Sequence, residues 1–407
     1  MKFRTLLLVT CHFPPSAASG SFRLLGFARH LPACGWRTVV VAPPNMPFEP
    51  VDDKLCAKIP RETVVYSAPY PRGNRVTRRF ASFAAWMPTA LKACARAIAA
   101  ERPDAVLTSS PPHAIHLLGR LLKARYGLPW IVDYRDPWVN GLGEACPRTW
   151  HARWESLKEK LVLGAADGII VNTPLARAAL RDDLPQFAAK MTAITNGFDP
   201  EDFIRNEPIV VRPSTLSVLH TGELYCGRDP RPLFEALQGL RLPSSMKRLQ
   251  VAFLGQSSDP NHDWPAEIRQ RGLENTVSFA GHVPYSQALT RMQAADILLL
   301  LDNPGRRVGI PAKLFEYFGA RRPILALAEP HGDVAWALRV SGVRHRIAPP
   351  TDAIQIRHGL TELIADVTSL GTRTCESLTE GFTRAHMATQ LARFLDQKTA
   401  RSHACVG

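Results

Sequence analysis

The sequence lacks the patterns that mark several common protein classes. Its eight cysteines include no Cys-x-x-Cys pair, and they form no cluster with histidine at zinc-site spacing, so we expect no structural metal. No apolar run reaches the roughly 18 residues of a membrane-spanning helix. Neither a Gly-x-Gly-x-x-Gly nor a Walker motif occurs, which excludes the dinucleotide fingerprint and the P-loop. Scattered cysteines of this kind are typical of reduced thiols in a cytosolic protein.

Signatures of nucleic-acid-binding modules are missing too, because the chain has no zinc finger, RNA-binding motif or basic run with interleaved aromatics. The charge is nevertheless strongly positive, at +14. Residues 1–200 hold 26 Lys and Arg against 15 Asp and Glu, a surplus of 11. A basic first half favours an anionic partner such as a membrane, a nucleic acid or a phosphorylated acceptor, although many basic proteins simply carry their charge.

What the sequence does contain is a regular alternation of short apolar runs and helical stretches. With 407 residues and 45% hydrophobic content, the chain is long enough for two or three globular domains. We interpret Arg4 to Thr10 as a first buried strand rather than a signal peptide, because its apolar core is short and Pro14-Pro15 follows at once.

The alternation predicts an α/β fold with two doubly wound units, each a parallel sheet covered on both faces. The first unit should hold residues 1–198 and the second residues 199–375. Ligands bind beyond the carboxyl ends of parallel strands, so we expect the two sheets to face one another across a cleft. The final helix, 376–397, places Phe382, Met387, Leu391 and Phe394 at near-helical spacing, which predicts a core-packing stripe.

The most informative segment is Gly309 to Leu327, GIPAKLFEYFGARRPILAL. It follows a strand-like run, and Pro311 has the fixed φ that suits the first turn of a helix. Lys313 and Glu316 share a face of that helix. A helix N-terminus with a lysine forms an anion site, and a carboxylate one turn deeper can hold a sugar diol. Phosphate beside diol is the outline of a nucleotide; the alternative is an ordinary crossover helix with solvated charges.

Other loops carry weaker signals. Gly20 and Ser21 stand where a loop becomes a helix, and small residues there let backbone N–H groups approach a phosphate. In the run DYRDPWVNG, Asp136 is the better candidate for a ligand crevice, because it lies beyond the strand proper. Asp133, Arg135 and Asp136 would alternatively form a local ion-pair network.

The second half repeats this logic in LHTGELYCGRDPRPL, residues 219–233. Gly222 follows a strand, and Arg228 precedes a helix that Pro230 can start. We therefore expect Arg228 and Lys313 to converge on one diphosphate from two loops. His282, in FAGHVPYSQAL, is a candidate contact to a base, although a lone histidine is more often structural.

Taken in order, these pieces resemble the GT-B fold of glycosyltransferase family 4, and most closely the bacterial members that build surface polysaccharides. The segments that carry the resemblance are FPPSAASGSFR, YRDPW, TNGFDPEDF, HTGELYCGRDPRPL, FAGHVPYSQAL and IPAKLFEYFGARRPILAL. The resemblance implies two Rossmann-like domains, the second binding a UDP- or GDP-linked sugar donor and the first binding the acceptor. It also implies that the final helix crosses back onto the first domain.

Carried over by position, the resemblance assigns roles to single residues. Arg228 and Lys313 would stabilise the leaving diphosphate, and Asp136 would lie beside the transferred sugar; these three form the catalytic set. Donor binding would fall to Gly20, Ser21, Gly222, His282, Val283, Pro311, Leu314 and Glu316, with Glu316 holding the ribose and His282 and Val283 lying along the base.

One position departs from the family pattern. Many relatives have two glutamates separated by seven residues; Glu316 is the second, and Val308 stands where the first would be. That carboxylate normally touches the sugar, so donor recognition is the property most affected. The family implies transfer with retention at the anomeric carbon. No Asp-x-Asp metal motif is evident, so we expect neither a metal nor a cofactor.

The acceptor is expected to be lipid-linked or a growing saccharide. Residues 72–96 mix arginine and lysine with Phe80, Phe83, Trp86 and Met87, which predicts either a helix at an anionic membrane surface or a helix with a solvated basic face. The expected location is cytoplasmic, at the inner face of the membrane. Two alternatives are a nucleotide-sugar 2-epimerase and a non-catalytic nucleotide-sugar-binding protein.

Overall fold

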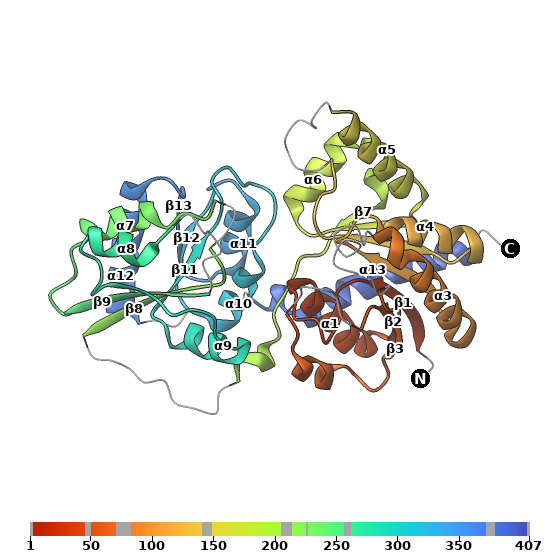
Figure 1. The fold of residues 1–407 in the computed structure, drawn as a ribbon, viewed down its shortest axis with the longest axis horizontal. Coiled ribbons are helices and arrows are strands. Elements are labelled where there is room, and N and C mark those ends of the chain that lie inside the picture. Colours follow the sequence, from red (N-terminus) through yellow and green to blue (C-terminus); the bar gives the residue numbers. More distant parts are fainter. Residues whose placement is uncertain are drawn as a thin grey trace. The chain divides into compact units, whose positions relative to one another are not determined.

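The computed structural model describes residues 3–44, 50–70, 83–140, 149–204, 214–224, 227–255, 262–371 and 379–404. The chain forms two compact units (Figure 1). The first unit comprises Met1–Asn196 together with Arg384–Gly407, and the second comprises Gly197–Thr383. The C-terminal segment therefore belongs to the same unit as the N-terminus.

The first unit is built on a seven-stranded parallel sheet with the strand order β3-β2-β1-β4-β5-β6-β7. Central strands such as β5 are buried along their whole length, as expected for a parallel sheet covered on both faces. The strands are β1 (Arg4–Thr10), β2 (Trp36–Ala42), β3 (Val64–Ser67), β4 (Ala105–Ser109), β5 (Trp130–Tyr134), β6 (Gly168–Val171) and β7 (Met191–Ala193).

Helices cover this sheet. The apolar side of α1 packs with α13 in one cluster with Leu6 and Leu8 of β1, while α3 and α4 contact the sheet elsewhere. The helices are α1 (Ser19–His30), α3 (Phe83–Glu101), α4 (Ile115–Tyr126), α5 (Trp150–Ala165), α6 (Pro174–Asp183) and α13 (Arg384–Ala404), with short 3-10 turns η1 (Leu31–Cys34), η2 (Asp53–Lys58) and η3 (Pro185–Lys190).

The stripe predicted on the final helix is confirmed for Met387, Leu391 and Phe394, which are buried in the core of the first unit. The prediction was wrong for Phe382. That residue ends the 3-10 turn η5 (Thr379–Phe382), before α13 begins, and its ring packs on Phe315 and Phe318 in the core of the second unit. The sequence pattern assigned Phe382 to the helix because its spacing from Met387 is close to helical. The chain nevertheless passes from the second unit to the first between these two residues.

A buried ion pair joins α1 to β5. Arg23 donates from Nε and Nη2 to the two carboxylate oxygens of Asp133, at 3.1 and 2.8 Å, and both side chains are almost fully buried. Ser109 also donates to Asp133, at 2.7 Å, and Arg23 Nη1 donates to the carbonyl of Thr195 at 2.6 Å. One of the two interpretations of this run was a local ion-pair network of Asp133, Arg135 and Asp136; the structure instead pairs Asp133 with Arg23, a residue distant in sequence.

The second unit has a six-stranded parallel sheet with the order β10-β9-β8-β11-β12-β13. The strand predicted at Arg4 to Thr10 is present in the first unit with those bounds, as β1. The strands of the second unit are β8 (Thr215–Thr221), β9 (Arg248–Leu254), β10 (Val277–Phe279), β11 (Ile297–Leu301), β12 (Ile324–Leu327) and β13 (His345–Ala348).

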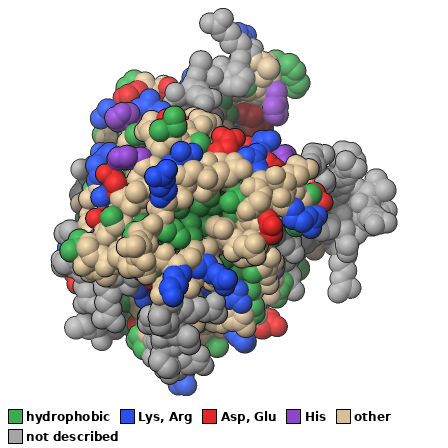
Figure 2. All heavy atoms as spheres, turned by 90° about the vertical axis from the view of Figure 1, so that its left-hand side faces the viewer, with side chains coloured by type: hydrophobic (Ala, Val, Ile, Leu, Met, Phe, Trp, Pro, Cys, Tyr) green, Lys and Arg blue, Asp and Glu red, His purple; other side chains and the backbone are tan. Residues whose placement is uncertain are grey.

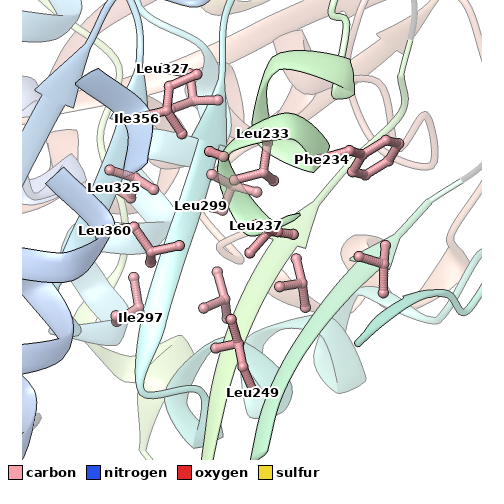
Figure 3. Close-up of a cluster of buried hydrophobic side chains, with 14 of the residues drawn as sticks. Leu233, Phe234, Leu237, Leu249, Ile297, Leu299, Leu325, Leu327, Ile356 and Leu360 are labelled. Atoms are coloured by element: carbon pink, nitrogen blue, oxygen red, sulfur yellow. The ribbon is translucent and has the colours of Figure 1, made fainter. Parts of the chain in front are cut away.

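Alternate residues of the central strands enter two different cores. Leu299 and Leu325 point into a cluster with α7, α8 and α12 (Figure 3), whereas Leu298 and Leu300 point into one with α9, α10 and α11. The helices are α7 (Arg231–Gln238), α8 (Trp264–Gln270), α9 (Tyr285–Ala294), α10 (Ala312–Ala320), α11 (Asp333–Ser341) and α12 (Ala353–Leu370), with the turn η4 (Pro200–Phe203). The period-two alternation thus gives the sheet a helical layer on each face.

One face of the molecule carries hydrophobic, basic and acidic side chains together. In Figure 2, hydrophobic side chains near the middle of the visible face are bordered by Lys and Arg side chains, with Asp and Glu among them. Within the described ranges, no helix is both long and apolar enough to cross a membrane.

Removal of the Arg23 guanidinium should destabilise the first unit severely. The variant Arg23→Ala leaves the Asp133 carboxylate buried without its cation, and breaking such a pair typically costs about 3–5 kcal/mol. Chemical denaturation, monitored with a spectroscopic probe in the first unit, measures the change in the free energy of unfolding.

The matched control is Arg181→Ala. Arg181 pairs with Asp182 at 3.2 Å, but both side chains are more than half exposed, so little or no change in stability is expected. Equal unfolding midpoints for the two variants would contradict a structural role for the buried pair.

Candidate functional site

The first turn of α10 holds the residues that the sequence singled out most strongly. Pro311 has φ −58° and ψ 135° and occupies the N-cap, one residue before the helix rather than in its first turn as predicted. Leu314 donates its N–H to the Pro311 carbonyl at 3.0 Å, and its side chain is fully buried in the apolar core. Leu314 therefore anchors the helix start by packing, while Lys313 projects from the same turn.

Lys313 lies against a buried histidine at the end of β8. Its Nζ is 3.2 Å from Nε2 of His220, and Nδ1 of His220 is 2.9 Å from the carbonyl oxygen of Leu299. Because a carbonyl can only accept, Nδ1 carries the proton and Nε2 offers its lone pair to Lys313. Burial, reinforced by the Lys313 charge, holds the pKa of His220 well below its ordinary value, so the ring is neutral.

Lys313 and Arg228 both reach the loop that follows β8, because Lys313 lies against Gly222 and Arg228 bonds the carbonyl of the next residue, Glu223. Burial, and to a smaller extent repulsion from Arg228, lowers the pKa of Lys313 to about 7. Glu316 and Asp302 have smaller effects in the opposite direction. Arg228 lies in the loop between β8 and α7 and donates to the Glu223 carbonyl at 3.4 Å. Both predicted site cations therefore lie beside the loop of Gly222 and Glu223, close enough for their charges to repel.

Three glycines shape the backbone around these cations. Gly222 follows β8 with φ +98°, and a Cβ on it would meet Lys313 Nζ at 2.8 Å. Gly255 follows β9 with φ +141°, and a Cβ there would meet the Gly222 carbonyl oxygen at 2.4 Å. Gly255 N–H in turn donates to Gly281 at 2.8 Å. These contacts pack the loops after β8, β9 and β10 against one another.

His282 and Val283 follow Gly281 directly, so this glycine chain connects them to the loop of Gly222. The His282 side chain is exposed, and Val283 packs partly against the core. The geometry leaves the imidazole of His282 open to solvent at the carboxyl edge of the sheet. Its role as a base contact stays a prediction.

Tyr317, which the sequence analysis did not select, ties α10 to β8. Its hydroxyl accepts from the Thr221 N–H at 3.1 Å and donates to the Leu299 carbonyl at 3.0 Å. The Leu299 carbonyl is also the partner of His220. One backbone oxygen thus positions both the ring below Lys313 and the helix that carries it.

The loop from Asp302 to Ile310 shows what replaces the missing family carboxylate. Arg306 folds back onto the buried Asp302 at 3.0 Å and donates to the carbonyl of Val308 at 3.3 Å. Gly309 N–H donates to Asp333 at 2.8 Å. The carboxylates of Asp302 and Asp333 therefore hold this loop, and Val308 contributes no charged group to it.

A cavity of about 230 Å³ borders Arg228 within the second unit. On its wall the ring of His262 stacks on Trp264 with centroids 4.7 Å apart. Arg231 holds Asp229 at 2.6 Å, so the carboxylate next to Arg228 is already engaged by another arginine. Residues lining the cavity include Leu224, Arg228, Arg231, His262, Trp264 and Thr351.

In the first unit, Gly20 lies in the first turn of α1 under the guanidinium of Arg135. A Cβ at Gly20 would come within 2.1 Å of Arg135 Nη1, so only glycine permits this approach. The adjacent Ser21 is fully buried. The structure therefore places a cation from the loop after β5 at a helix N-terminus, next to two residues that the sequence predicted for phosphate contact.

Asp136 lies just beyond β5 with its side chain exposed. His113 donates from Nε2 to the Asp136 carbonyl at 2.9 Å and stacks on Trp138. Behind it, Tyr134 donates to the buried Glu159, which also accepts from Asn140. The sequence analysis missed His113 and Glu159; the signal for His113 is its place after β4, at the same sheet edge as Asp136.

Among the residues that the structure describes, no three His, Cys, Asp or Glu side chains gather as metal ligands. The described cysteines Cys11, Cys34, Cys56 and Cys94 are free thiols.

Comparison with known proteins bears on both units. Residues 21–197 match the sequence model of the glycosyl transferase 4-like domain. No curated protein matches the sequence.

Solved structures share the fold over nearly the whole length. Sucrose-phosphate synthase from Thermosynechococcus elongatus has a TM-score of 0.68 at 17% identity, with 98% of this chain and 100% of that chain covered. The Anabaena protein HepE in complex with UDP-glucose has a TM-score of 0.55 at 16% identity, with 99% of both chains covered. A UDP-N-acetylglucosamine 2-epimerase has a TM-score of 0.56 at 13% identity, with 96% and 95% covered.

These likenesses show the two-domain architecture, and the matched domain lies in the first unit. Residues 21–197 of the chain therefore match a glycosyl transferase 4-like domain, and the chain as a whole has the GT-B fold of two Rossmann-like units.

Proposed function

We propose that this protein transfers a sugar from a UDP- or GDP-linked donor, with retention at the anomeric carbon, to a lipid-linked or saccharide acceptor in bacterial surface-polysaccharide synthesis. The second unit binds the donor and the first binds the acceptor. The proposal requires neither a metal nor a cofactor, and it places the enzyme in the cytoplasm at the inner face of the membrane.

The observation that carries this proposal is the pairing of Lys313 with Arg228. Two like charges held together at a helix N-terminus repel each other, and the positive end of the helix dipole adds to the cost. A pyrophosphate bound there would remove that repulsion and accept hydrogen bonds from both side chains and from the first turn of α10. The site is thus complementary to a dianion.

The same arrangement suits the chemistry of sugar transfer. As the bond from the anomeric carbon to the phosphate oxygen breaks, negative charge grows on the leaving diphosphate, where Lys313 and Arg228 are already in place. The acceptor hydroxyl attacks from the face that the diphosphate leaves. Glu316, on the same helix, holds the ribose diol, and Gly222 allows the donor to approach the backbone.

Other proposed roles belong to the first unit. The start of α1 at Gly20, with the Arg135 guanidinium over it, offers a phosphate contact, the buried Ser21 supports that turn, and the carboxylate of Asp136 lies beside the transferred sugar. Val308 offers no carboxylate, and Arg306 is engaged by Asp302. Sugar recognition therefore relies on groups other than a glutamate at position 308.

Membrane contact through residues 72–96 stays part of the proposal in a narrower form. Residues 71–82 lie outside the described part of the chain, and with them Phe80. In α3, Lys92 and Arg96 are exposed, which suits an anionic surface. Trp86 is fully buried and donates to the Ala68 carbonyl at 2.6 Å; it is a core residue and not an interfacial anchor.

Replacement of either site cation should slow transfer without unfolding the protein. We expect Lys313→Ala and Arg228→Ala each to reduce turnover by about 10²–10³, the typical cost of losing one preorganised charge contact. Initial rates with a panel of UDP- and GDP-sugars measure the effect, and thermal melts confirm the fold.

The matched control is Lys247→Ala, which removes an exposed lysine of the same unit and should leave the rate unchanged. The same panel separates the alternatives. Hydrolysis or transfer of the donor would support a glycosyltransferase, and epimerisation of the donor would support a nucleotide-sugar 2-epimerase. Binding without turnover would support a non-catalytic nucleotide-sugar-binding protein. Turnover at the wild-type level in both site variants would refute the proposed site.

Donor affinity should depend on pH through Lys313. Its pKa lies near 7 in the free protein, and a bound pyrophosphate raises it by stabilising the charged form. Affinity for UDP-glucose should therefore fall by up to about ten-fold per pH unit above 7. Calorimetry from about pH 6 to about pH 8, roughly one unit on each side of the titration, measures the affinity at constant ionic strength.

Lys313→Ala provides the control for this measurement, because it removes the titrating group. Its affinity should be weak and should no longer fall across the same range. A nucleotide-sugar is the right probe, since its phosphates are diesters that do not titrate near neutrality. A wild-type affinity that is flat or rises with pH would contradict the assignment.

A further inference from the structure

Helix α5 exposes an apolar stripe that the fold leaves uncovered. Thr149 caps its N-terminus by accepting from the Ala152 N–H at 3.2 Å, so the helix begins at Trp150. The stripe consists of Trp150, Trp154, Leu157 and Leu161, which are 80%, 53%, 47% and 49% exposed. At 100° per residue, these positions fall within an arc of roughly 60°.

The opposite side of α5 is the one that packs on the first unit. Glu159, Val162 and Leu163 are buried there. The stripe is therefore not the edge of the core but a second apolar face directed away from it. Two exposed tryptophans on one helix are unusual for a surface without a partner.

Cationic side chains border the stripe on both flanks. Helical geometry places Arg153 and Lys160 on one side and Lys158 on the other. Arg153 and Lys160 are exposed, and Lys158 Nζ lies 5.9 Å from the Trp154 ring centroid.

The two carboxylates of α5 lie on the side away from the stripe. Glu155 bonds Lys158 and the Trp138 indole, at 2.5 and 2.9 Å. Glu159 accepts from Tyr134 and Asn140 in the interior. The water-facing half of α5 therefore presents an apolar centre with a positive border at Arg153 and Lys160, while Lys158 on the other border is paired with Glu155.

We propose that this face of α5 docks onto an anionic lipid surface. Tryptophan is suited to the boundary between head groups and acyl chains, because its ring is apolar and its N–H is polar. Flanking lysines and arginines then reach the acidic head groups. The surplus of positive charge in residues 1–200 favours the same partner.

A second copy of the chain fits this face less well. Two such stripes packed together would bring Arg153 and Lys160 of both helices to one interface, and no carboxylate of α5 is placed to neutralise them. Like charges across an interface oppose association. Charge complementarity therefore favours lipid as the occupant.

This inference deepens one part of the proposed function, the location at a membrane, by assigning the contact to α5. That helix lies outside the 72–96 segment and includes none of the donor-site residues. Donor chemistry and membrane contact can therefore fail separately.

The test is sedimentation of the full chain with sucrose-loaded vesicles of phosphatidylcholine alone or mixed with phosphatidylglycerol. We expect the wild-type protein to bind the mixed vesicles. The double variant Trp154→Ser and Leu157→Ser should bind them at least about ten-fold more weakly, because two apolar side chains no longer enter the lipid interface. Arg153→Gln should weaken it about five-fold on mixed vesicles only.

The matched control replaces exposed apolar residues on a helix of the second unit. Ile354 and Leu370 of α12 are 77% and 69% exposed, and Ile354→Ser with Leu370→Ser should bind as wild type. Thermal melts and donor turnover in vesicle-free buffer check that the α5 variant is folded and active.

Three outcomes would overturn the inference. One is wild-type protein that stays in the supernatant with the mixed vesicles; a second is an α5 variant that sediments as wild type. The third is a concentration-dependent dimer, seen in analytical ultracentrifugation of wild type and lost in the α5 variant, which would assign the face to a second copy.

Discussion

The hydrogen bond between Lys313 and a neutral His220 is the interaction on which the candidate site depends. The Leu299 carbonyl determines the tautomer of the ring, because it accepts a hydrogen bond from Nδ1–H and leaves Nε2 to accept one from the lysine. A charged imidazole would repel Lys313. The buried histidine therefore acts as a neutral support, which fixes the ammonium group at the start of α10 without neutralising it.

The fold could be predicted wherever the apolar pattern was continuous. Runs such as Ile297–Leu301 have no polar interruption and read directly as buried parallel strands. The edge strand β13, His345–Ala348, was missed because three of its four residues are only partly buried and two are basic. Helix α12 was also missed, although Ile356, Leu360 and Leu363 are at helical spacing.

The cations of the candidate site could be predicted from the sequence, but the residues that hold them in place could not. Lys313 and Arg228 lie beside turn signals, whereas His220 meets Lys313 across 93 residues of sequence, a contact that only strand order and register create. Tryptophans show the same limit. Trp86 and Trp154 both belong to helices with basic residues, yet one is in the core and the other faces solvent; sequence pattern alone does not separate them.

The return of α13 to the first unit has a consequence for biosynthesis. Its Leu391 and Leu395 complete the hydrophobic cluster around Leu6 and Leu8, so the N-terminal sheet emerges from the ribosome with one face incomplete. The second unit, by contrast, is continuous from Gly197 to Thr383. During synthesis the middle of the chain can therefore finish folding first, and the N-terminal half has to wait for the last helix before its core closes.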